Sequence, residues 1–362
     1  MIKVNYSASV KKRLKNTLLC LGLVAFSLVQ AQEKSPVAAA SDAAALQLLH
    51  ADYQPLLDSV ATLVKKTGFA HITAENVLQM RMADAVKVQP PLATPAVAKK
   101  VIKGSSGQPD VTLYVINATA GSNKPALLYM HGGGYVLGSP DLVIPGMQRL
   151  AEKHHCTVVV VQYRLAPETP FPGALEDNYA ALNYMYQNSE QLGIDKNRIV
   201  IMGHSAGGGH AAMLAIAARD RGEIPVKQQI LIFPMLDDRT GSSRDVPEHI
   251  GQLLWSRTSN QFGWSALLGQ QAGMAEAPYG AVPARVKDLS RLPPTQIIVG
   301  AIDLFVEENI DYAKRLIQAG VATELHVLPG IFHASETIYP EAEVSKQFTE
   351  LENKAIHQAL WQ

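Results

Sequence analysis

The feature that most constrains this chain is a regular alternation of short apolar runs with longer helical patterns. The runs are rich in β-branched residues and show little polar–apolar alternation, as expected for strands buried on both faces. They cover residues 111–117, 126–130, 157–163, 199–202, 229–233, 295–299 and 325–328. Helical patterns lie between them, at residues 175–187, 206–219, 306–319 and 343–360. This alternation predicts an α/β fold with a mostly parallel central sheet flanked by helices on both faces.

The N-terminus predicts an export signal at residues 1–31. Basic residues at 11–15 precede an apolar run at 17–29, and Ala31 closes a small-residue pattern of the kind that signal peptidase cleaves. Retention as a membrane anchor is the alternative, but the run is shorter than the roughly 20 residues needed to span a bilayer. We therefore expect an exported protein, periplasmic or extracellular, with no stable membrane insertion after cleavage.

Two further regions depart from the alternation. Residues 32–95 begin with an Ala/Ser/Pro-rich lead-in and then show helical patterns at about 42–66 and 75–86. An insertion with short helical patterns occupies residues 238–290, approximately, between two predicted strands. In a doubly wound sheet, an insertion after the carboxyl end of a strand lies over the ligand crevice. We expect the insertion and the N-terminal helices to cap a domain at 96–362; the alternative is an outer layer with no part in the site.

Charge and cysteine content exclude some classes of protein. Residues 1–31 contain five of the 32 Lys and Arg and none of the 32 Asp and Glu, so cleavage leaves a net charge of about −5. That charge argues against a nucleic-acid surface. Cleavage also removes Cys20, and the remaining Cys156 can form no internal disulfide. Because Cys156 precedes a β-branched run, we expect it to be a buried structural residue and not a nucleophile.

A glycine-rich turn joins the strand at 199–202 to the helix at 206–219; it reads Gly-His-Ser-Ala-Gly-Gly at residues 203–208. Glycines permit a sharp strand-to-helix turn that lifts Ser205 above the sheet, at the positive end of the helix. The motif alone is a weak signal, but its place between a buried strand and a helix makes it specific. It predicts Ser205 as a nucleophile, with a structural serine in a glycine-rich turn as the alternative.

A second glycine-rich segment follows the strand at 126–130 and reads His-Gly-Gly-Gly at residues 131–134. Acyl transfer places negative charge on a carbonyl oxygen, and fixed N–H donors must already point at that oxygen. We expect the N–H groups of Gly133, Gly134 and Ala206 to form this oxyanion hole. His131 precedes the nucleophile in the chain, and we expect it to hold the glycine loop by hydrogen bonds.

The general base and its acid are predicted from chain order, because folds of this kind place serine first, then an acid, then histidine. Of the histidines after Ser205, His333 lies in a loop just beyond a strand, whereas the others lie in helices, in the insertion or within a strand. Asp303, which follows the strand at 295–299, is the expected acid. Its rivals are Glu307 and Glu308 in the first turn of the next helix, and Asp237 and Asp238 two strands away.

These motifs, with Tyr-Arg-Leu-Ala-Pro-Glu at residues 163–168, resemble the hormone-sensitive-lipase-like esterases, bacterial family IV, of the α/β-hydrolase superfamily. The block at 303–308 is similar to that family's aspartate block, with Leu304 in place of the usual proline, and His333 falls in its Gly-x-x-His block. The resemblance covers roughly residues 95–340. His204 departs from the family's usual aspartate before the nucleophile. The side chain at that position normally points away from the nucleophile's hydroxyl, so the departure concerns local electrostatics and not the identity of the base.

The resemblance implies hydrolysis of carboxylic esters with short to medium acyl chains, through a covalent acyl-enzyme and without a metal or organic cofactor. We expect Tyr135, Trp255 and Trp264 to form pocket walls around a small-molecule ester. Hydrolysis of amides or peptides by the same residues is one alternative, and a non-catalytic small-molecule binder is another. The resemblance also leaves a homodimer open, because dimerisation through the sheet edge and the last helix is common in that family.

Overall fold

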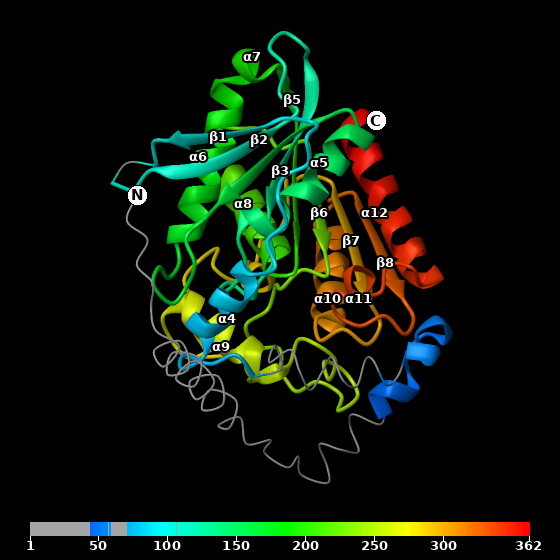
Figure 1. The fold of residues 1–362 in the computed structure, drawn as a ribbon. Coiled ribbons are helices and arrows are strands. Elements are labelled where there is room, and N and C mark those ends of the chain that lie inside the picture. The colour runs from blue at the N-terminus through cyan, green and yellow to red at the C-terminus, as the bar shows by residue number, and fades with distance from the viewer. Residues whose placement is uncertain (1–43, 57, 59–70, 106) are drawn as a thin grey trace, which may run out of the picture. The chain divides into compact units, whose positions relative to one another are not determined.

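The β-branched runs belong to one sheet, which has eight strands in the described part of the chain (Figure 1). The computed structural model describes residues 44–56, 58, 71–105 and 107–362. The expected export signal lies outside these residues. The strands are β1 (Val97–Ile102), β2 (Val111–Ile116), β3 (Lys124–Met130), β4 (Thr157–Gln162), β5 (Ile194–His204), β6 (Gln228–Ile232), β7 (Thr295–Gly300) and β8 (Thr323–Leu328). Their order in the sheet is β1-β2-β4-β3-β5-β6-β7-β8.

The sheet is parallel from β4 to β8, and only the pairs β1–β2 and β2–β4 are antiparallel. The carboxyl ends of β5, β6, β7 and β8 therefore lie at one edge of the sheet, where the loops that follow them can meet. This arrangement confirms the predicted α/β fold with a mostly parallel sheet.

Apolar side chains cover the two faces of the sheet, because successive residues of a strand point to opposite faces. In β5, Ile199 and Ile201 belong to the core beneath α6 (Gly173–Gln187), α8 (Ala206–Arg221) and α10 (Val306–Gln318). Val200 and Met202 belong to the core beneath α5 (Ile144–Lys153) and α12 (Glu343–Trp361). We call these the α8 face and the α12 face.

Strand β1 was not expected from the sequence. Its Val-Ala-Lys-Lys-Val-Ile stretch exposes three of its six residues and buries only Ile102, because β1 is an antiparallel strand at the edge of the sheet. An edge strand needs no continuous apolar run, so the pattern typical of buried strands is missing. Helix α5 was also not predicted.

The first helical pattern does not form one continuous helix where the structure describes it. Residues 44–47 are helical, a turn follows, and η1 (Ala51–Leu56) is a 3-10 helix that contains Pro55. The rest of this pattern lies largely outside the described residues. The second pattern forms α4 (Val77–Ala85), close to its predicted bounds.

The N-terminal described segment packs against the C-terminal part of the chain. Tyr53 is fully buried, and its hydroxyl bonds to Ser335 Oγ at 3.1 Å and to Ser345 Oγ at 2.7 Å. Asp52 Oδ2 accepts a hydrogen bond of 2.8 Å from the backbone N–H of Val344, at the start of α12. The segment therefore braces α12 and the short helix α11 (Ser335–Ile338) that precedes it.

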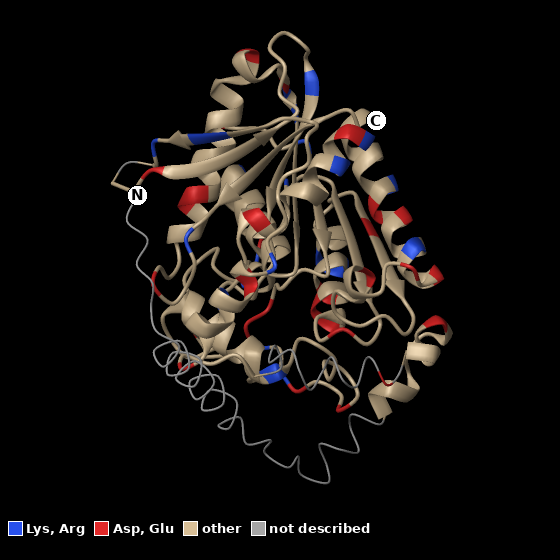
Figure 2. Cartoon of the chain, in the orientation of Figure 1, with Lys and Arg blue, Asp and Glu red and all other residues tan. Residues whose placement is uncertain are grey.

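The segment between β6 and β7 contains α9 (Arg257–Leu268) and the 3-10 helix η4 (Pro283–Arg285). The segment before α4 contacts α9, because the backbone N–H of Ile72 donates to Ser259 Oγ at 3.0 Å; both helices are labelled in Figure 1. Among helices of the described residues, none is both long and apolar enough to cross a membrane. Acidic and basic residues are interspersed over the elements, with both signs on α12 (Figure 2).

Candidate active site

Ser205 sits in a tight turn between β5 and α8. Its backbone has φ 56° and ψ −123°, an unusual conformation for a residue other than glycine. The turn needs glycine on both sides of Ser205, at positions 203 and 207. A Cβ on Gly203 would clash with the backbone of Gly207, and a Cβ on Gly207 would clash with the carbonyl oxygen of Met130. The sequence therefore folds here into a strained turn that holds Ser205 at the N-terminus of α8.

His333 and Asp303 meet Ser205 at the carboxyl edge of the sheet. His333 Nε2 lies 2.9 Å from Ser205 Oγ, and His333 Nδ1 lies 2.8 Å from Asp303 Oδ2. The other carboxylate oxygen of Asp303 accepts a 2.9 Å hydrogen bond from the backbone N–H of Phe305. All three polar side chains are buried. The structure thus brings together the serine, histidine and aspartate that the sequence singled out.

Two aromatic rings that the sequence analysis did not select pack against the imidazole of His333. The ring of Phe233 lies edge-on at 4.8 Å between centroids, and the ring of Phe305 at 5.2 Å. Phe233 follows β6 and Phe305 follows Asp303 by two residues, so each lies just beyond a strand that ends at the site. Their positions fix the orientation of the imidazole. An apolar residue after a strand gives no sequence signal that separates this role from ordinary core packing.

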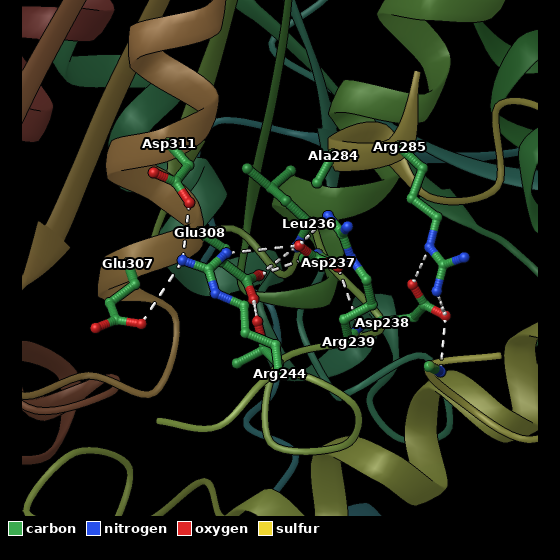
Figure 3. Close-up of polar contacts among 12 residues, drawn as sticks. Leu236, Asp237, Asp238, Arg239, Arg244, Ala284, Arg285, Glu307, Glu308 and Asp311 are labelled. Carbon is green, nitrogen blue, oxygen red and sulfur yellow. Dashed lines mark hydrogen bonds and ion pairs between the residues drawn. The ribbon is translucent and has the colours of Figure 1, made fainter. Parts of the chain in front are cut away.

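The rival carboxylates have other partners, which are drawn in Figure 3. Glu308 Oε1 accepts hydrogen bonds from the backbone N–H groups of Leu236 and Asp237, at 2.6 and 3.2 Å. Burial raises the pKa of Glu308 well above its ordinary value, and the charge of Asp237 adds to this effect. Asp237 itself pairs with Arg239 at 2.8 Å.

The remaining two rivals also form ion pairs. Asp238 pairs with Arg285 at 2.7 Å, and Glu307 lies 3.6 Å from Arg244, which contacts Asp311 at 2.8 Å (Figure 3). These carboxylates tie the segment after β6 to α10 and to η4, and none of them replaces Asp303 beside His333.

The glycine loop lies directly beside Ser205. A Cβ on Gly132 would approach the Cβ of Ser205 to 3.4 Å. Gly133 and Gly134 both have positive φ, 132° and 60°. Their N–H groups and that of Ala206 donate to no backbone carbonyl in the hydrogen bonds found among the described residues. The loop therefore leaves backbone donors available next to the serine hydroxyl.

His131 holds this loop, in line with its predicted role. His131 Nδ1 lies 2.8 Å from the carbonyl oxygen of Gly132, and the Tyr163 hydroxyl donates to the carbonyl oxygen of His131 at 2.6 Å. The two rings are stacked at 4.3 Å. Burial lowers the pKa of His131 to about 4, so the imidazole is neutral at neutral pH and acts as a packed, hydrogen-bonding group.

Of the three predicted pocket walls, the structure brings only Trp255 to the site. Its ring occupies the place that a Cβ on Gly134 would take, and its centroid lies 6.4 Å from that of His333. Tyr135 and Trp264 are only 1% and 0% exposed. The Tyr135 hydroxyl donates to the carbonyl oxygen of Met235 at 2.7 Å, and the two rings pack edge-on at 4.9 Å. We correct the prediction for these two residues, because their rings pack on each other inside the core. Trp255 is also only 4% exposed, but its ring lies against Gly134 and near His333.

Cys156 is buried directly before β4, and burial raises the pKa of its thiol to about 12. His204 points away from the Ser205 hydroxyl, towards Tyr129 and Glu352. Its Nδ1 lies 3.0 Å from the Tyr129 hydroxyl oxygen and its Nε2 lies 3.3 Å from Glu352 Oε1. The chain order of the motifs gave no indication of these two partners.

Comparison with known proteins identifies the family of this chain. A family described as alpha/beta hydrolase fold matches residues 127–337. Carboxylesterase NlhH of Mycobacterium tuberculosis is 30% identical over 287 residues, which cover 77% of this chain and 89% of that protein. Esterase LipI of the same organism is 34% identical over 218 residues; they cover 59% of this chain and 66% of that protein, just under two thirds of its length.

Solved structures give the same result. Bacterial heroin esterase superposes with a TM-score of 0.75 at 33% identity, covering 88% of this chain and 99% of its own. Esterase LipW from Mycobacterium marinum gives a TM-score of 0.72 at 33% identity, with 88% and 98% covered. The chain belongs to the α/β-hydrolase family, in the hormone-sensitive-lipase-like group that its motifs resemble. Within that group it is a carboxylic ester hydrolase.

Proposed function

We propose that this chain is a serine carboxylesterase in which Ser205 is the nucleophile, His333 the general base and Asp303 the acid that orients the base. The observation that carries the proposal is the continuous hydrogen-bonded line from Ser205 Oγ through both imidazole nitrogens to Asp303 Oδ2, at 2.9 and 2.8 Å. A nucleophile and base within hydrogen-bond reach, with the base oriented by a third group, is the arrangement that activates a serine hydroxyl.

The reaction follows from this line in two halves. His333 Nε2 accepts the Ser205 proton as Oγ attacks the ester carbonyl carbon, and the N–H groups of Gly133, Gly134 and Ala206 stabilise the negative oxygen. His333 then returns the proton to the leaving alcohol, and the acyl group remains on Ser205. A water molecule, deprotonated by His333, cleaves this acyl-enzyme, and the acid product departs as Ser205 regains its proton.

Short to medium acyl chains are the substrates that we propose. Trp255 supports this choice, because its large ring packs on Gly134, directly beside the proposed oxyanion donors. One relative, 34% identical over 214 residues, is the ethyl acetate hydrolase of Pseudomonas putida. That name fits an enzyme for small esters, and we extend it to this chain as part of the proposal.

Hydrolysis of p-nitrophenyl acetate, butyrate, octanoate and palmitate by the wild type, Ser205→Ala and His333→Ala tests the proposal. We expect the rate to peak at acetate or butyrate. It should fall by roughly 10³-fold or more in each variant, because Ser205 and His333 carry out one proton transfer together and neither works without the other. Circular dichroism should show that both variants are folded. Substantial turnover by Ser205→Ala would contradict the assignment, and cleavage of matched anilides at the ester rate would favour an amidase.

Export, the cap and the dimer are also proposals. The basic and apolar segments before Ala31 support removal of residues 1–31, and N-terminal sequencing of protein from the periplasm or medium should then begin at Gln32. Retention of Met1 in all recovered protein would contradict it.

The contact of Trp255 with Gly134 supports a cap formed by the insertion at 238–290. Sedimentation would distinguish a monomer from a homodimer.

A further inference from the structure

His204, the residue before the proposed nucleophile, belongs to a second group of titratable side chains. Like Met202 it points to the α12 face of the sheet, and 20% of its side chain remains exposed. Its ring can bond both of its partners in either protonation state. A neutral ring donates from Nε2 to Glu352 and accepts at Nδ1 from Tyr129; a cationic ring donates at both nitrogens.

Glu336, on α11, lies close enough to His204 for the charges of the two side chains to interact. The side chain is 6% exposed, and its Oε1 accepts a hydrogen bond of 3.1 Å from Thr337 Oγ1. Its Oε2 is buried and has no hydrogen-bond partner among the described residues. Burial raises the pKa of Glu336 to about 7, with the charge of His204 opposing that rise. This carboxyl therefore changes its charge near neutral pH, in a place where an unpaired negative oxygen is costly.

The group adjoins both residues of the proposed proton transfer. His204 is bonded directly to Ser205, and Glu336 follows His333 by three residues. The ring of Phe233 lies edge-on to both histidines, with centroids 5.5 Å from His204 and 4.8 Å from His333. A shift of the His204 ring would therefore reach the imidazole of His333 through the ring of Phe233, and a shift of Glu336 would reach it through the short stretch of chain between them.

Groups from each neighbouring element determine the charge of this cluster. Burial opposes protonation of His204, but the charge and hydrogen bond of Glu352 and the charge of Glu336 raise its pKa above the ordinary 6.5. Tyr129 of β3 contributes a hydroxyl, and Tyr53 of η1 reaches the start of α11 through Ser335. When Glu336 ionises, its negative charge is added to that of Glu352 beside the His204 ring.

We propose that His204, Glu352 and Glu336 form a positioning cluster that holds α11 and the His333 loop in place while Glu336 is neutral, and that weakens this hold when Glu336 ionises. None of the three touches the substrate; they act through the position of His333. The inference rests on the proposed function, because its main readout is ester hydrolysis.

The test compares kcat of Glu336→Gln with kcat of the wild type between pH 5.5 and 8.5, on p-nitrophenyl butyrate. Glutamine keeps the shape of the neutral carboxyl, so we expect the ratio of variant to wild type to rise at least threefold, along one ionisation curve centred near pH 7. In a His204→Asn background the same curve should move to higher pH, because the opposing cation is gone. Glu343→Gln, at an exposed carboxyl paired with Lys346, is the matched control and should give a flat ratio.

A flat ratio for Glu336→Gln would overturn the inference, and so would a ratio lowered equally at every pH, which indicates a purely structural residue. If the wild type hydrolyses no ester, the proposed function fails instead. Urea unfolding then decides on the cluster: the free energy of unfolding of the wild type should decline relative to Glu336→Gln as the pH rises from 4.5 to 7. Parallel curves would refute the role of Glu336.

Discussion

Gly133 is a residue outside the proposed triad at which the addition of one methyl group should lower kcat strongly. Its φ of 132° is disfavoured for other residues, and a Cβ would clash with the carbonyl oxygen of Leu137. Gly133→Ala must therefore move the loop and its N–H donors. Loss of one oxyanion donor costs roughly 10²–10³ in kcat, and we expect a loss of that size on p-nitrophenyl butyrate.

Gly146 provides the matched control for this prediction. It lies in α5, and a Cβ there would meet no atom within 4 Å. Gly146→Ala should leave kcat unchanged and raise stability by about 0.5–1 kcal/mol, as alanine for glycine does within a helix. If both variants lose activity equally, the loop around Gly133 has no special role.

Single residues of the site were predictable where chain order and motif context act together. Ser205, Asp303 and His333 each follow a strand, and parallel strands bring those ends to one edge. The orientation of aromatic side chains was not predictable. Tyr135 directly follows the glycine loop, yet its positive φ of 69° turns its side chain into the core. There the Tyr135 hydroxyl donates a hydrogen bond to the carbonyl oxygen of Met235.

At the scale of elements, the buried carboxyl of Glu308 joins α10 to the segment after β6 (Figure 3). Its two carboxyl oxygens accept hydrogen bonds from the backbone N–H groups of Leu236 and Asp237 and from the hydroxyl of Thr240. Glu308→Ala leaves these donors buried without an acceptor and should lower the free energy of unfolding by roughly 2 kcal/mol or more. Urea denaturation at pH 6 measures the change.

Two other variants make this prediction specific. Because burial raises the pKa of Glu308, glutamine resembles its neutral form, and Glu308→Gln should cost less than about 1 kcal/mol. Arg244→Ala removes partly exposed ion pairs with Glu307 and Asp311 and a 3.7 Å contact with Asp237. Asp237 keeps its shorter pair with Arg239, so this variant should also cost less than about 1 kcal/mol. Equal losses in all three variants would show that Glu308 does not anchor this segment.

Buried helices and strands were predictable because their periodicity is set by the faces that they bury. The sequence predicts α6, α8, α10 and α12 to within two residues of their observed bounds. β1 lacked that signal because only one of its side chains is buried, and the turn before η1 interrupts an apolar spacing that fits a helix. In both cases tertiary contacts, and not local pattern, decide the structure.

For the whole molecule, buried titratable groups predict a stability maximum on the acid side of neutrality. Burial lowers the pKa of His131 to about 4 and that of His210 to about 3, so below 6.5 the unfolded chain binds protons that the folded chain does not. Burial raises the pKa of Glu336 to about 7 and the pKa of Glu308 well above its ordinary value, so above 4.5 the folded chain keeps protons that the unfolded chain loses.

The two effects on the free energy of unfolding oppose each other between pH 4.5 and 6.5. Below that window only the histidines lower stability, and above it only the carboxyl groups do. We expect the urea midpoint to be highest within it and to fall both at pH 3.5 and at pH 8. His210→Leu, which removes a buried imidazole with no hydrogen-bond partner among the described residues, should reduce the loss at pH 3.5. A midpoint that rises steadily from pH 6 to 8 would contradict the prediction.

The contacts of the N-terminal segment with α11 and α12 have a consequence for folding during synthesis on the ribosome. Tyr53 is paired with Ser335 and Ser345 across 282 and 292 residues of chain. Closing so long a loop is slow, and it cannot begin before Ser345 has left the ribosome. Ser205 is synthesised long before the partners that surround it, so a nascent chain contains the nucleophile without the means to use it. We therefore expect no ester hydrolysis before the part of the chain that contains Asp303 and His333 has been synthesised and folded.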